Sequence, residues 1–242
     1  HAPVQHRFPE SCRGGGIRGR HPPRIYPAHP PLDTADDDPT RVSNLAMETF
    51  IVIPCLNEED CIAATCASLG FGDGLEPFGR LVLVDNGSSD GTLGALSAIQ
   101  RTSPPGRVLI TQEHRRGYVP ARRAGMATVL AVAQREQLRE DLVLILQADA
   151  DTIYLPGYVQ TMGNAHRGGR GQLLEASAVT SRDFNREFPA FARLCREVDS
   201  EMELWFAPEA NQVVVDDKVC AFLLADYLAW GEHQDETDDC GK

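Results

Sequence analysis

The chain has 242 residues, a formal net charge of −12 at pH 7 and a hydrophobic share of 42%, which suits one large domain with its own core. An acidic protein repels phosphate backbones, so nucleic acid is not expected as a partner. No apolar run reaches the roughly 20 residues of a membrane-spanning helix, so no membrane span is expected.

The cysteines favour a reduced, cytoplasmic protein over a disulfide framework. There are seven of them, an odd number, and no Cys-x-x-Cys pair of the zinc type occurs. Disulfides are rare in the cytosol, where thiols are kept reduced. The first residues also lack the short apolar core of a secretory signal. We therefore expect a cytoplasmic location.

Residues 1–46 are expected to be disordered. They are dense in Pro, Arg, His and Gly and show no apolar periodicity, so they cannot bury enough surface to offset their chain entropy. Met47 lies just before the first predicted strand, and one hypothesis is that it is the natural start and that residues 1–46 are not native. A regulatory tail is the alternative. The organisation expected after this segment is a single domain over 47–233 and a frayed acidic tail over 234–242.

From residue 50 the pattern alternates between buried strands and helices. Short continuous apolar runs, typical of buried parallel strands, occupy 50–54, 81–84, 107–111 and 142–146. The predicted helices are 57–69 with Asn57 as its cap, a helix that ends near 100 with Ser89 or Asp90 as its cap, and 120–138 with proline in its first turn. This alternation predicts an α/β fold with a mainly parallel central sheet flanked by helices.

The second half of the chain is less regular. Its predicted elements are a strand over 173–179, a helix over 188–205, a short strand over 212–215 and a helix over 218–230. The helix over 188–205 has apolar residues at three- and four-residue spacing, which indicates an amphipathic helix.

Three polar clusters follow the predicted parallel strands, at 54–58, 85–90 and 147–152. In parallel sheets, ligands bind beyond the carboxyl ends of the strands. Because all three clusters lie at those ends, we expect them to converge although they are far apart in sequence. This convergence predicts a ligand site.

Asp149 and Asp151 are the candidate metal ligands. They flank one alanine directly after a buried strand. Mg²⁺ and Mn²⁺ take oxygen ligands, commonly one or two carboxylates, with water and substrate phosphates in the other positions. A metal held there neutralises charge on a leaving diphosphate. The alternative is that one aspartate caps the following turn and the other is solvated.

Asp85 and Arg122 are candidates for nucleotide binding. Asp85 ends the second strand, where a carboxylate can accept hydrogen bonds from a base or a ribose, or can serve the tight turn that Asp-Asn-Gly-Ser favours. Arginine binds phosphate through charge-assisted hydrogen bonds. The basic residues near this edge are Arg115, Arg116, Arg122 and Arg123. A solvated helix face accounts for most of these four, and we single out Arg122.

Asp216 and Asp217 are the candidates for a general base. They end the last predicted strand, where a carboxylate could take a proton from an acceptor hydroxyl. Asp before a helix is also an ordinary cap, so one aspartate can cap while the other catalyses. His233 is a lone histidine. A surface position is the simpler interpretation for it, and a metal or acceptor role is the other.

Three segments together resemble the family-2 inverting glycosyltransferases of GT-A fold. They are Ile51–Glu59, Leu83–Thr92 and Ala148–Asp151. The resemblance implies a metal-dependent enzyme that moves a sugar from a UDP- or GDP-sugar donor to an acceptor hydroxyl. It also implies a nucleotide-binding half over 47–152 and an acceptor half over 153–233.

The resemblance implies roles for individual residues on the donor side. It places Pro54, Asn57 and Glu58 in the lining of the nucleotide pocket and Asp85 against the base. The segment Ala-Arg-Arg-Ala-Gly that begins at residue 121 is similar to the family's Ala-Arg-Asn-Ala-Gly, which puts Arg122 near the nucleotide.

The resemblance also covers the metal and the base. Asp149 and Asp151 match the metal-binding Asp-x-Asp, which implies Mn²⁺ or Mg²⁺. The segment 215–222 resembles the one that carries the family's base, which suggests Asp217. Asp216 stands there in place of the usual glutamate.

Other enzyme classes fit less well. The Gln-x-x-Arg-Trp motif of processive family members is missing, so the resemblance implies a non-processive enzyme. A sugar-phosphate nucleotidyltransferase would carry a Gly-rich loop after the first strand, where this chain has Pro54-Cys-Leu-Asn57. Dehydrogenase and phosphate-loop motifs are also missing. A truncated or inactive domain that binds nucleotide or a partner without turnover stays open, as do the acceptor and a homodimer.

Overall fold

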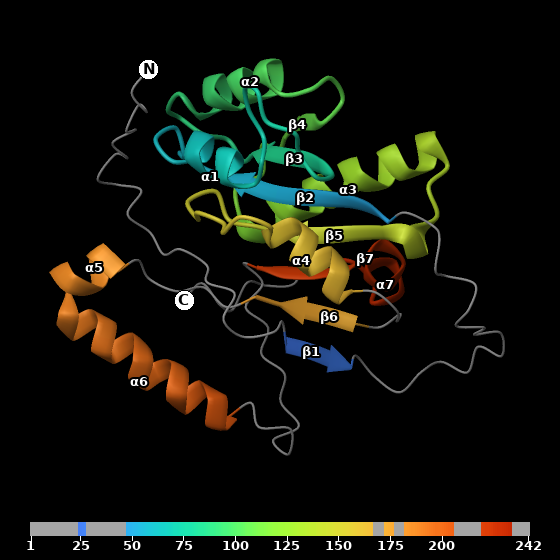
Figure 1. The fold of residues 1–242 in the computed structure, drawn as a ribbon. Coiled ribbons are helices and arrows are strands. Elements are labelled where there is room, and N and C mark those ends of the chain that lie inside the picture. Colours follow the sequence, from blue (N-terminus) through green and yellow to red (C-terminus); the bar gives the residue numbers. More distant parts are fainter. Residues whose placement is uncertain (1–23, 28–46, 167–171, 177–181, 206–218, 234–242) are drawn as a thin grey trace.

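A mixed sheet of seven strands forms the centre of the structure, a computed structural model that describes residues 24–27, 47–166, 172–176, 182–205 and 219–233 (Figure 1). The strands are β1 (Arg24–Pro27), β2 (Glu48–Cys55), β3 (Arg80–Asp85), β4 (Val108–Gln112), β5 (Val143–Gln147), β6 (Gln172–Glu175) and β7 (Cys220–Leu223). Their order across the sheet is β1-β6-β7-β5-β2-β3-β4. Strands β5, β2, β3 and β4 run parallel, and β7, β6 and β1 continue the sheet in antiparallel pairs.

Helices lie on both faces of this sheet (Figure 1). They are α1 (Ile62–Ser68), α2 (Thr92–Thr102), α3 (Tyr118–Glu136), α4 (Tyr158–Ala165), α5 (Arg182–Glu187), α6 (Pro189–Trp205) and α7 (Leu224–Ala229), with a short 3-10 turn at Glu140–Leu142. Ile51 and Ile53 of β2 pack in one core with α1, α2 and α4, whereas Phe50 and Val52 pack in a second core with α3 and α7. Successive side chains of a strand point to opposite faces, which is why one strand serves two cores.

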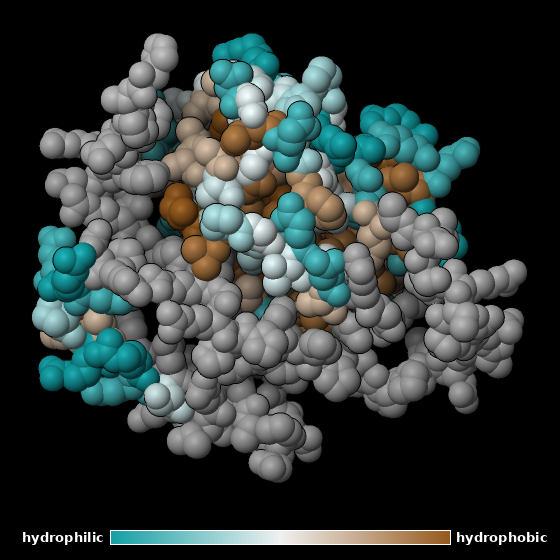
Figure 2. Space-filling view, viewed as in Figure 1, coloured by the Kyte–Doolittle hydropathy of each residue, from teal (hydrophilic) through white to brown (hydrophobic). Residues whose placement is uncertain are grey.

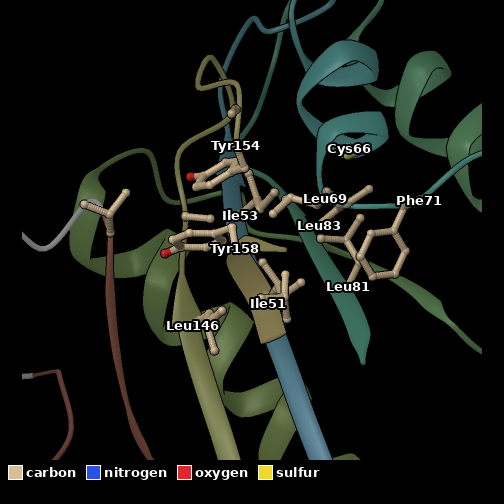
Figure 3. Close-up of a cluster of buried hydrophobic side chains, with 14 of the residues drawn as sticks. Ile51, Ile53, Cys66, Leu69, Phe71, Leu81, Leu83, Leu146, Tyr154 and Tyr158 are labelled. Carbon is tan, nitrogen blue, oxygen red and sulfur yellow. The ribbon is translucent and has the colours of Figure 1, made fainter. Parts of the chain in front are cut away.

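The core under α1 and α4 reaches up to the loop that follows β5. Tyr154 and Tyr158 are buried with their ring centroids 4.8 Å apart. The close-up shows both rings beside Ile53 of β2, with Leu146 of β5 below them (Figure 3). The loop after β5 is therefore anchored on the apolar core at Tyr154.

Helix α3 approaches the sheet closely at Gly125. A Cβ atom there would overlap the Val52 side chain of β2, which a glycine avoids because it has no side chain. This contact fixes the first half of α3, which carries Arg122, against the strand that carries the first polar cluster.

The parallel strands predicted from the sequence are confirmed, and each observed strand begins and ends within two residues of its prediction. The amphipathic helix over 188–205 is confirmed by α6, and β6 forms the first part of the strand predicted over 173–179. The strand predicted over 212–215 lies outside the described residues.

The helix predicted over 218–230 is wrong in its first half. Cys220–Leu223 form β7, which pairs antiparallel with both β5 and β6, and helix α7 begins only at Leu224. All four residues of β7 are buried. A short apolar run fits a buried strand as well as a helix, and only the pairing with neighbours separates the two.

Two smaller expectations are also corrected. Arg24–Pro27 form strand β1 and pair with β6, so disorder is wrong for these four residues. Strand pairing uses backbone hydrogen bonds, which form without an apolar sequence pattern. Cys55, Cys66 and Cys220 are buried thiols outside any disulfide, as expected for reduced cysteines, whereas Cys61 is disulfide-bonded. The preference for reduced cysteines is therefore wrong at Cys61.

The described surface is mixed in character. Hydrophilic residues gather at the top of the view, near α2, and at the left, over α5 and the first part of α6 (Figure 2). Helix α6 also exposes apolar side chains, among them Phe191 and Leu194. Across the described part of the chain, no helix combines the length and apolarity needed to cross a membrane.

Candidate functional site

The carboxyl ends of β2, β3 and β5 bring the three polar clusters to one edge of the sheet. Pro54 is half-buried and lies opposite Val84 of β3, and Cys55 lies opposite Asp85. Beyond the last paired residues, the backbone N–H of Asn86 donates to the Cys55 carbonyl at 2.9 Å. On the other side of β2, the N–H of Ala148, which follows β5, donates to the carbonyl of Val52 in β2 at 3.0 Å. The predicted convergence is thus present in the structure.

The loop after β2 is fastened to the loop after β3 by side-chain bonds to backbone N–H groups. The N–H groups of Asn57 and Glu58 donate to the hydroxyls of Ser88 and Thr92, at 3.1 and 2.7 Å. In the other direction, the N–H of Gly91 donates to the Glu59 carboxylate at 2.8 Å. Each loop therefore holds the other in place.

Asn57 does not cap a helix, contrary to the prediction. Helix α1 begins at Ile62, and Asn57 has a left-handed backbone with φ of 60°. Its side-chain oxygen accepts hydrogen bonds from the N–H and hydroxyl of Ser89, at 2.8 and 3.2 Å. Asparagine tolerates this backbone conformation better than most residues. The residue therefore turns the chain and supports the neighbouring loop.

Asp85 and Asn86 are both buried at the end of β3. One Asp85 carboxylate oxygen accepts the N–H of Ser88 at 3.2 Å, which closes the turn after the strand. The Asn86 side chain reaches the next loop: its amide nitrogen donates to the carbonyls of Glu113 and Arg115, and its oxygen accepts the N–H of Gly117. Asn86 thus fixes the segment from Glu113 to Gly117 beside Asp85.

The loop that carries Asp149 and Asp151 is anchored by α1 and by Tyr154. The backbone N–H of Asp149 donates to the Tyr154 hydroxyl at 2.9 Å, and the Thr65 hydroxyl donates to the Ala150 carbonyl at 2.7 Å. Burial raises the pKa of the Tyr154 hydroxyl well above its usual value, so the group stays protonated. The Asp149 side chain is 27% exposed, and Asp151 is exposed.

Negative charge gathers where this loop faces the end of β2. Partial burial raises the pKa of Glu58 to about 6, and the nearby carboxylates of Asp151, Asp149 and Asp90 add to the rise. In the described ranges, no three His, Cys, Asp or Glu side chains stand close enough to hold a metal by themselves. Coulombic repulsion acts over longer distances than metal coordination. The carboxylates can therefore raise the pKa of Glu58 although no three of them lie close enough to hold a metal by themselves.

This donor set fits a hard divalent cation. Its groups are carboxylate oxygens, partly exposed and mutually repelling, which a cation would stabilise. Mg²⁺-type sites commonly take only one or two protein carboxylates and complete their shell with water and substrate phosphates. Asp149 and Asp151 are the residues that would hold such an ion.

Arg122 lies behind the Asp149 loop. It is 1% exposed, its Nη1 donates to the side-chain oxygen of Gln147, and its Nη2 is 3.6 Å from an Asp149 oxygen. Gln147 is also buried, at the last position of β5. The structure therefore brings together every predicted site residue that it describes, and Asp217 lies outside the described residues.

His233 and Arg123 belong to a separate contact at the end of α7. The Arg123 guanidinium donates to the His233 carbonyl, with Nε at 3.1 Å, and a ring nitrogen of His233 is 2.9 Å from the Tyr227 hydroxyl. The ring is thus engaged with Tyr227, and this contact accounts for the arginine that departs from the resembled segment.

Three residues that build the site were not singled out from the sequence. Asn86 and Gln147 lie in the polar clusters predicted at 85–90 and 147–152 but had no role assigned, and Tyr154 lies outside the clusters. The residues with which they bond lie in other segments of the chain or follow a loop, so only the positions of Asn86 and Gln147 at strand ends give a signal.

The chain matches the family model described as glycosyl transferase family 2 over residues 50–171. This match covers half of the chain, and the chain belongs to that family. Its architecture is the α/β fold that the sequence predicts, with a central mixed sheet flanked by helices. No curated protein matches the chain.

Several solved structures are similar to part of the chain. Glucosyl-3-phosphoglycerate synthase from Mycobacterium tuberculosis, in complex with UDP, is 20% identical with a TM-score of 0.45, over 74% of this chain and 57% of that one. The mannosyltransferase PcManGT from Pyrobaculum calidifontis, in complex with GDP-Man and Mn2+, is 23% identical with a TM-score of 0.39, over 57% and 36%. S. aureus TarS 1–349 is 20% identical with a TM-score of 0.32, over 43% and 28%. The matched part of the chain thus spans 28% to 57% of these structures.

Proposed function

We propose that this chain is the catalytic domain of a metal-dependent, inverting and non-processive glycosyltransferase that acts on a UDP- or GDP-sugar. The observation that carries the proposal is the convergence of Asp85, Glu58 and the Asp149–Asp151 loop at the ends of three parallel strands, in a member of this family. A site with this position and this all-oxygen donor set suits a nucleoside diphosphate held through a cation.

The nucleotide would lie over the ends of β2 and β3. Pro54, Asn57 and Glu58 form the lining on β2, and Asp85 is the hydrogen-bond acceptor on β3 for the base or ribose. The bonds that fasten the two loops support this placement, because loops that are already ordered lose less entropy when a ligand binds. Arg122 belongs to the same site through its ion pair with Asp149.

Asp149 and Asp151 would hold Mn²⁺ or Mg²⁺ against the diphosphate. A bound divalent ion supplies positive charge that stabilises the leaving nucleoside diphosphate. Thr65 and Tyr154 keep the loop backbone in place through their hydroxyls. These contacts support the proposal, since a ligand loop that is already ordered loses less entropy on binding.

Asp217 is proposed as the general base. Its carboxylate would take the proton of the acceptor hydroxyl while the acceptor oxygen forms a bond to the anomeric carbon. The bond from that carbon to the donor phosphate oxygen breaks at the same time, and the electron pair leaves with the diphosphate. Attack from the face opposite the leaving group inverts the configuration.

Calorimetry tests this function. UDP and GDP are titrated with and without Mn²⁺ into the wild type and into Asp151→Asn, followed by a donor screen for transfer or hydrolysis. We expect one nucleotide to bind in a Mn²⁺-dependent way that the substitution removes. If neither nucleotide binds with metal dependence, the proposal is wrong. Metal-dependent binding without any turnover would instead identify an inactive domain.

A further inference from the structure

Arg122 is a charged side chain inside the domain. It sits near the start of α3 and is 1% exposed. Its Nη1 donates to the side-chain oxygen of Gln147, and its Nη2 is 3.6 Å from Oδ1 of Asp149. Its Cζ lies 4.4 Å from the centroid of the Tyr118 ring, so an aromatic ring covers one face of the guanidinium.

We infer that Arg122 is a positioning residue that fixes the Asp149 carboxylate for a divalent cation, and that it is not itself a ligand of the nucleotide. The part of this inference that concerns the cation rests on the proposed function. The pairing of Arg122 with Asp149 rests on the geometry alone.

Burial gives the pairing its importance. A buried charge is stabilised only when partners replace its hydration. The Nε of Arg122 is buried without a hydrogen-bond partner among the described residues. The stabilisation of the guanidinium therefore depends on its Nη1 and Nη2 contacts, and of these Asp149 supplies the opposite charge.

The same contacts determine how the chain leaves β5. Gln147 ends the strand and Asp149 follows two residues later, so one guanidinium contacts both ends of a three-residue segment. The Tyr154 hydroxyl holds the same aspartate through its backbone N–H. Asp149 is thus held by its backbone from the α1 side of the sheet and by its side chain from α3 on the other side.

The surroundings of Arg122 disfavour direct contact with a nucleotide. A phosphate could reach its guanidinium only by displacing Tyr118 or the Asp149 carboxylate. Arg115 and Arg116 are exposed near the same edge of the sheet. A phosphate arriving from solvent reaches these exposed side chains before it reaches the buried Arg122.

The first experiment titrates Mn²⁺ alone into the wild type, Arg122→Met, Arg122→Lys and the control Arg123→Met. The control removes a neighbouring arginine whose contact is the His233 carbonyl and not the site. We expect Arg122→Met to weaken Mn²⁺ binding about 10- to 100-fold, the usual range for a residue that orients a metal ligand. Arg122→Lys keeps the charge but loses the planar guanidinium, so its Mn²⁺ affinity should lie between those of Arg122→Met and the wild type. Arg123→Met should bind Mn²⁺ like the wild type.

Nucleotide binding at saturating Mn²⁺ separates positioning from direct contact. We expect UDP and GDP to bind the Mn²⁺-loaded forms of Arg122→Met and of the wild type equally well. Loss of this binding with unchanged Mn²⁺ affinity would make Arg122 a nucleotide ligand and overturn the inference. Unchanged binding of both Mn²⁺ and nucleotide would leave only a structural role and would overturn it as well.

A stability cycle tests the pairing without any ligand. In EDTA, Asp149→Asn leaves the Arg122 charge buried without its counterion, and we expect the melting temperature to fall by about 5–10 °C. In the Arg122→Met background, Asp149→Asn should change the melting temperature far less, since the buried positive charge is no longer there. Equal effects in both backgrounds contradict the pairing. If the wild type binds neither Mn²⁺ nor nucleotide, the proposed function fails while this cycle still decides the pairing.

Discussion

The two sides of the candidate site are held by different forces. On the side of β2 and β3, the loops at 57–59 and 85–92 are joined by neutral and charge-assisted hydrogen bonds to backbone N–H groups. On the side of β5, the loop at 149–151 has a few backbone anchors and carries carboxylates that repel Glu58. The first side is complete without a ligand, whereas the second side accumulates charge of one sign.

This difference predicts that substitutions on the hydrogen-bonded side change stability, whereas substitutions on the carboxylate side change cation binding. A substitution on the hydrogen-bonded side leaves buried donors or acceptors unsatisfied, so it lowers stability first. Replacing the exposed carboxylate of Asp151 removes repulsion, so it spares stability and reduces cation binding, whereas Asp149 also pairs with the buried Arg122 and its loss lowers stability. Charge accumulation at the cost of stability is typical of functional sites rather than of scaffolds.

The largest expected effect is the separation of binding from stability by Asp151→Asn. Metal-dependent nucleotide binding should weaken about 100-fold or more, because losing a ligand costs at least as much as losing a residue that orients one. The melting temperature in EDTA should stay the same or rise, since one carboxylate near Glu58 is neutralised. Asp73→Asn is the matched control on an exposed loop. A drop in melting temperature that accounts for the lost binding would break the contrast between the two sides.

Asn86→Ala tests the hydrogen-bonded side, where a substitution should lower stability. It removes three hydrogen bonds of a buried side chain, and we expect a loss of about 2–4 kcal/mol in the free energy of unfolding. Hydrogen exchange at the N–H of Gly117 should accelerate, because this group donates to Asn86. Asn164→Ala on the exposed side of α4 should leave both measurements near wild type. Similar losses in the two variants would show that Asn86 is not a special anchor.

The parallel half of the fold could be predicted from the sequence because its signals are local. Its strands are apolar runs, three of which end in polar clusters, and the rule that such ends share one sheet edge places Asp85 and the Asp149 loop on the same edge, on either side of β2. Strand β7 could not be recognised in the same way. Its four residues are apolar on both faces, and their state depends on pairing with β5 and β6.

The side chains that support the site are harder to predict from the sequence than the candidate binding residues. Asn57 looks like a helix cap in sequence, yet its oxygen accepts from Ser89, 32 residues away. Asn86 bonds to a loop 27 to 31 residues later, and Gln147 to an arginine 25 residues earlier. Contacts across such separations leave no periodic pattern, so only the assembled fold shows them.

Thr65→Val sharpens the comparison at the anchor of the carboxylate loop. The substitution keeps the shape of a buried side chain but removes the hydroxyl that donates to the Ala150 carbonyl at 2.7 Å. We expect a loss of about 1 kcal/mol in stability, the usual net value of one hydrogen bond. Thr102→Val removes a similar bond on an exposed helix face and should cost less. Urea unfolding of both variants measures the difference, and equal costs would mean that the anchor contributes nothing particular.

The smallest expected effect is the pH dependence that Glu58 adds to stability. Its pKa rises from 4.5 to about 6 in the folded chain, chiefly through burial and then through Asp151 and Asp149. The folded state therefore binds more protons than the unfolded state between those pH values, so this carboxyl lowers stability as pH rises through the window. Glu58→Gln removes the titration, and the stability gap in EDTA between the variant and the wild type should widen from pH 4.5 to pH 6 in favour of the variant. Urea midpoints across this range measure the gap. A constant gap would mean that neither burial nor the nearby carboxylates raise the pKa of Glu58, and the contrast between the two sides would then rest on the hydrogen bonds alone.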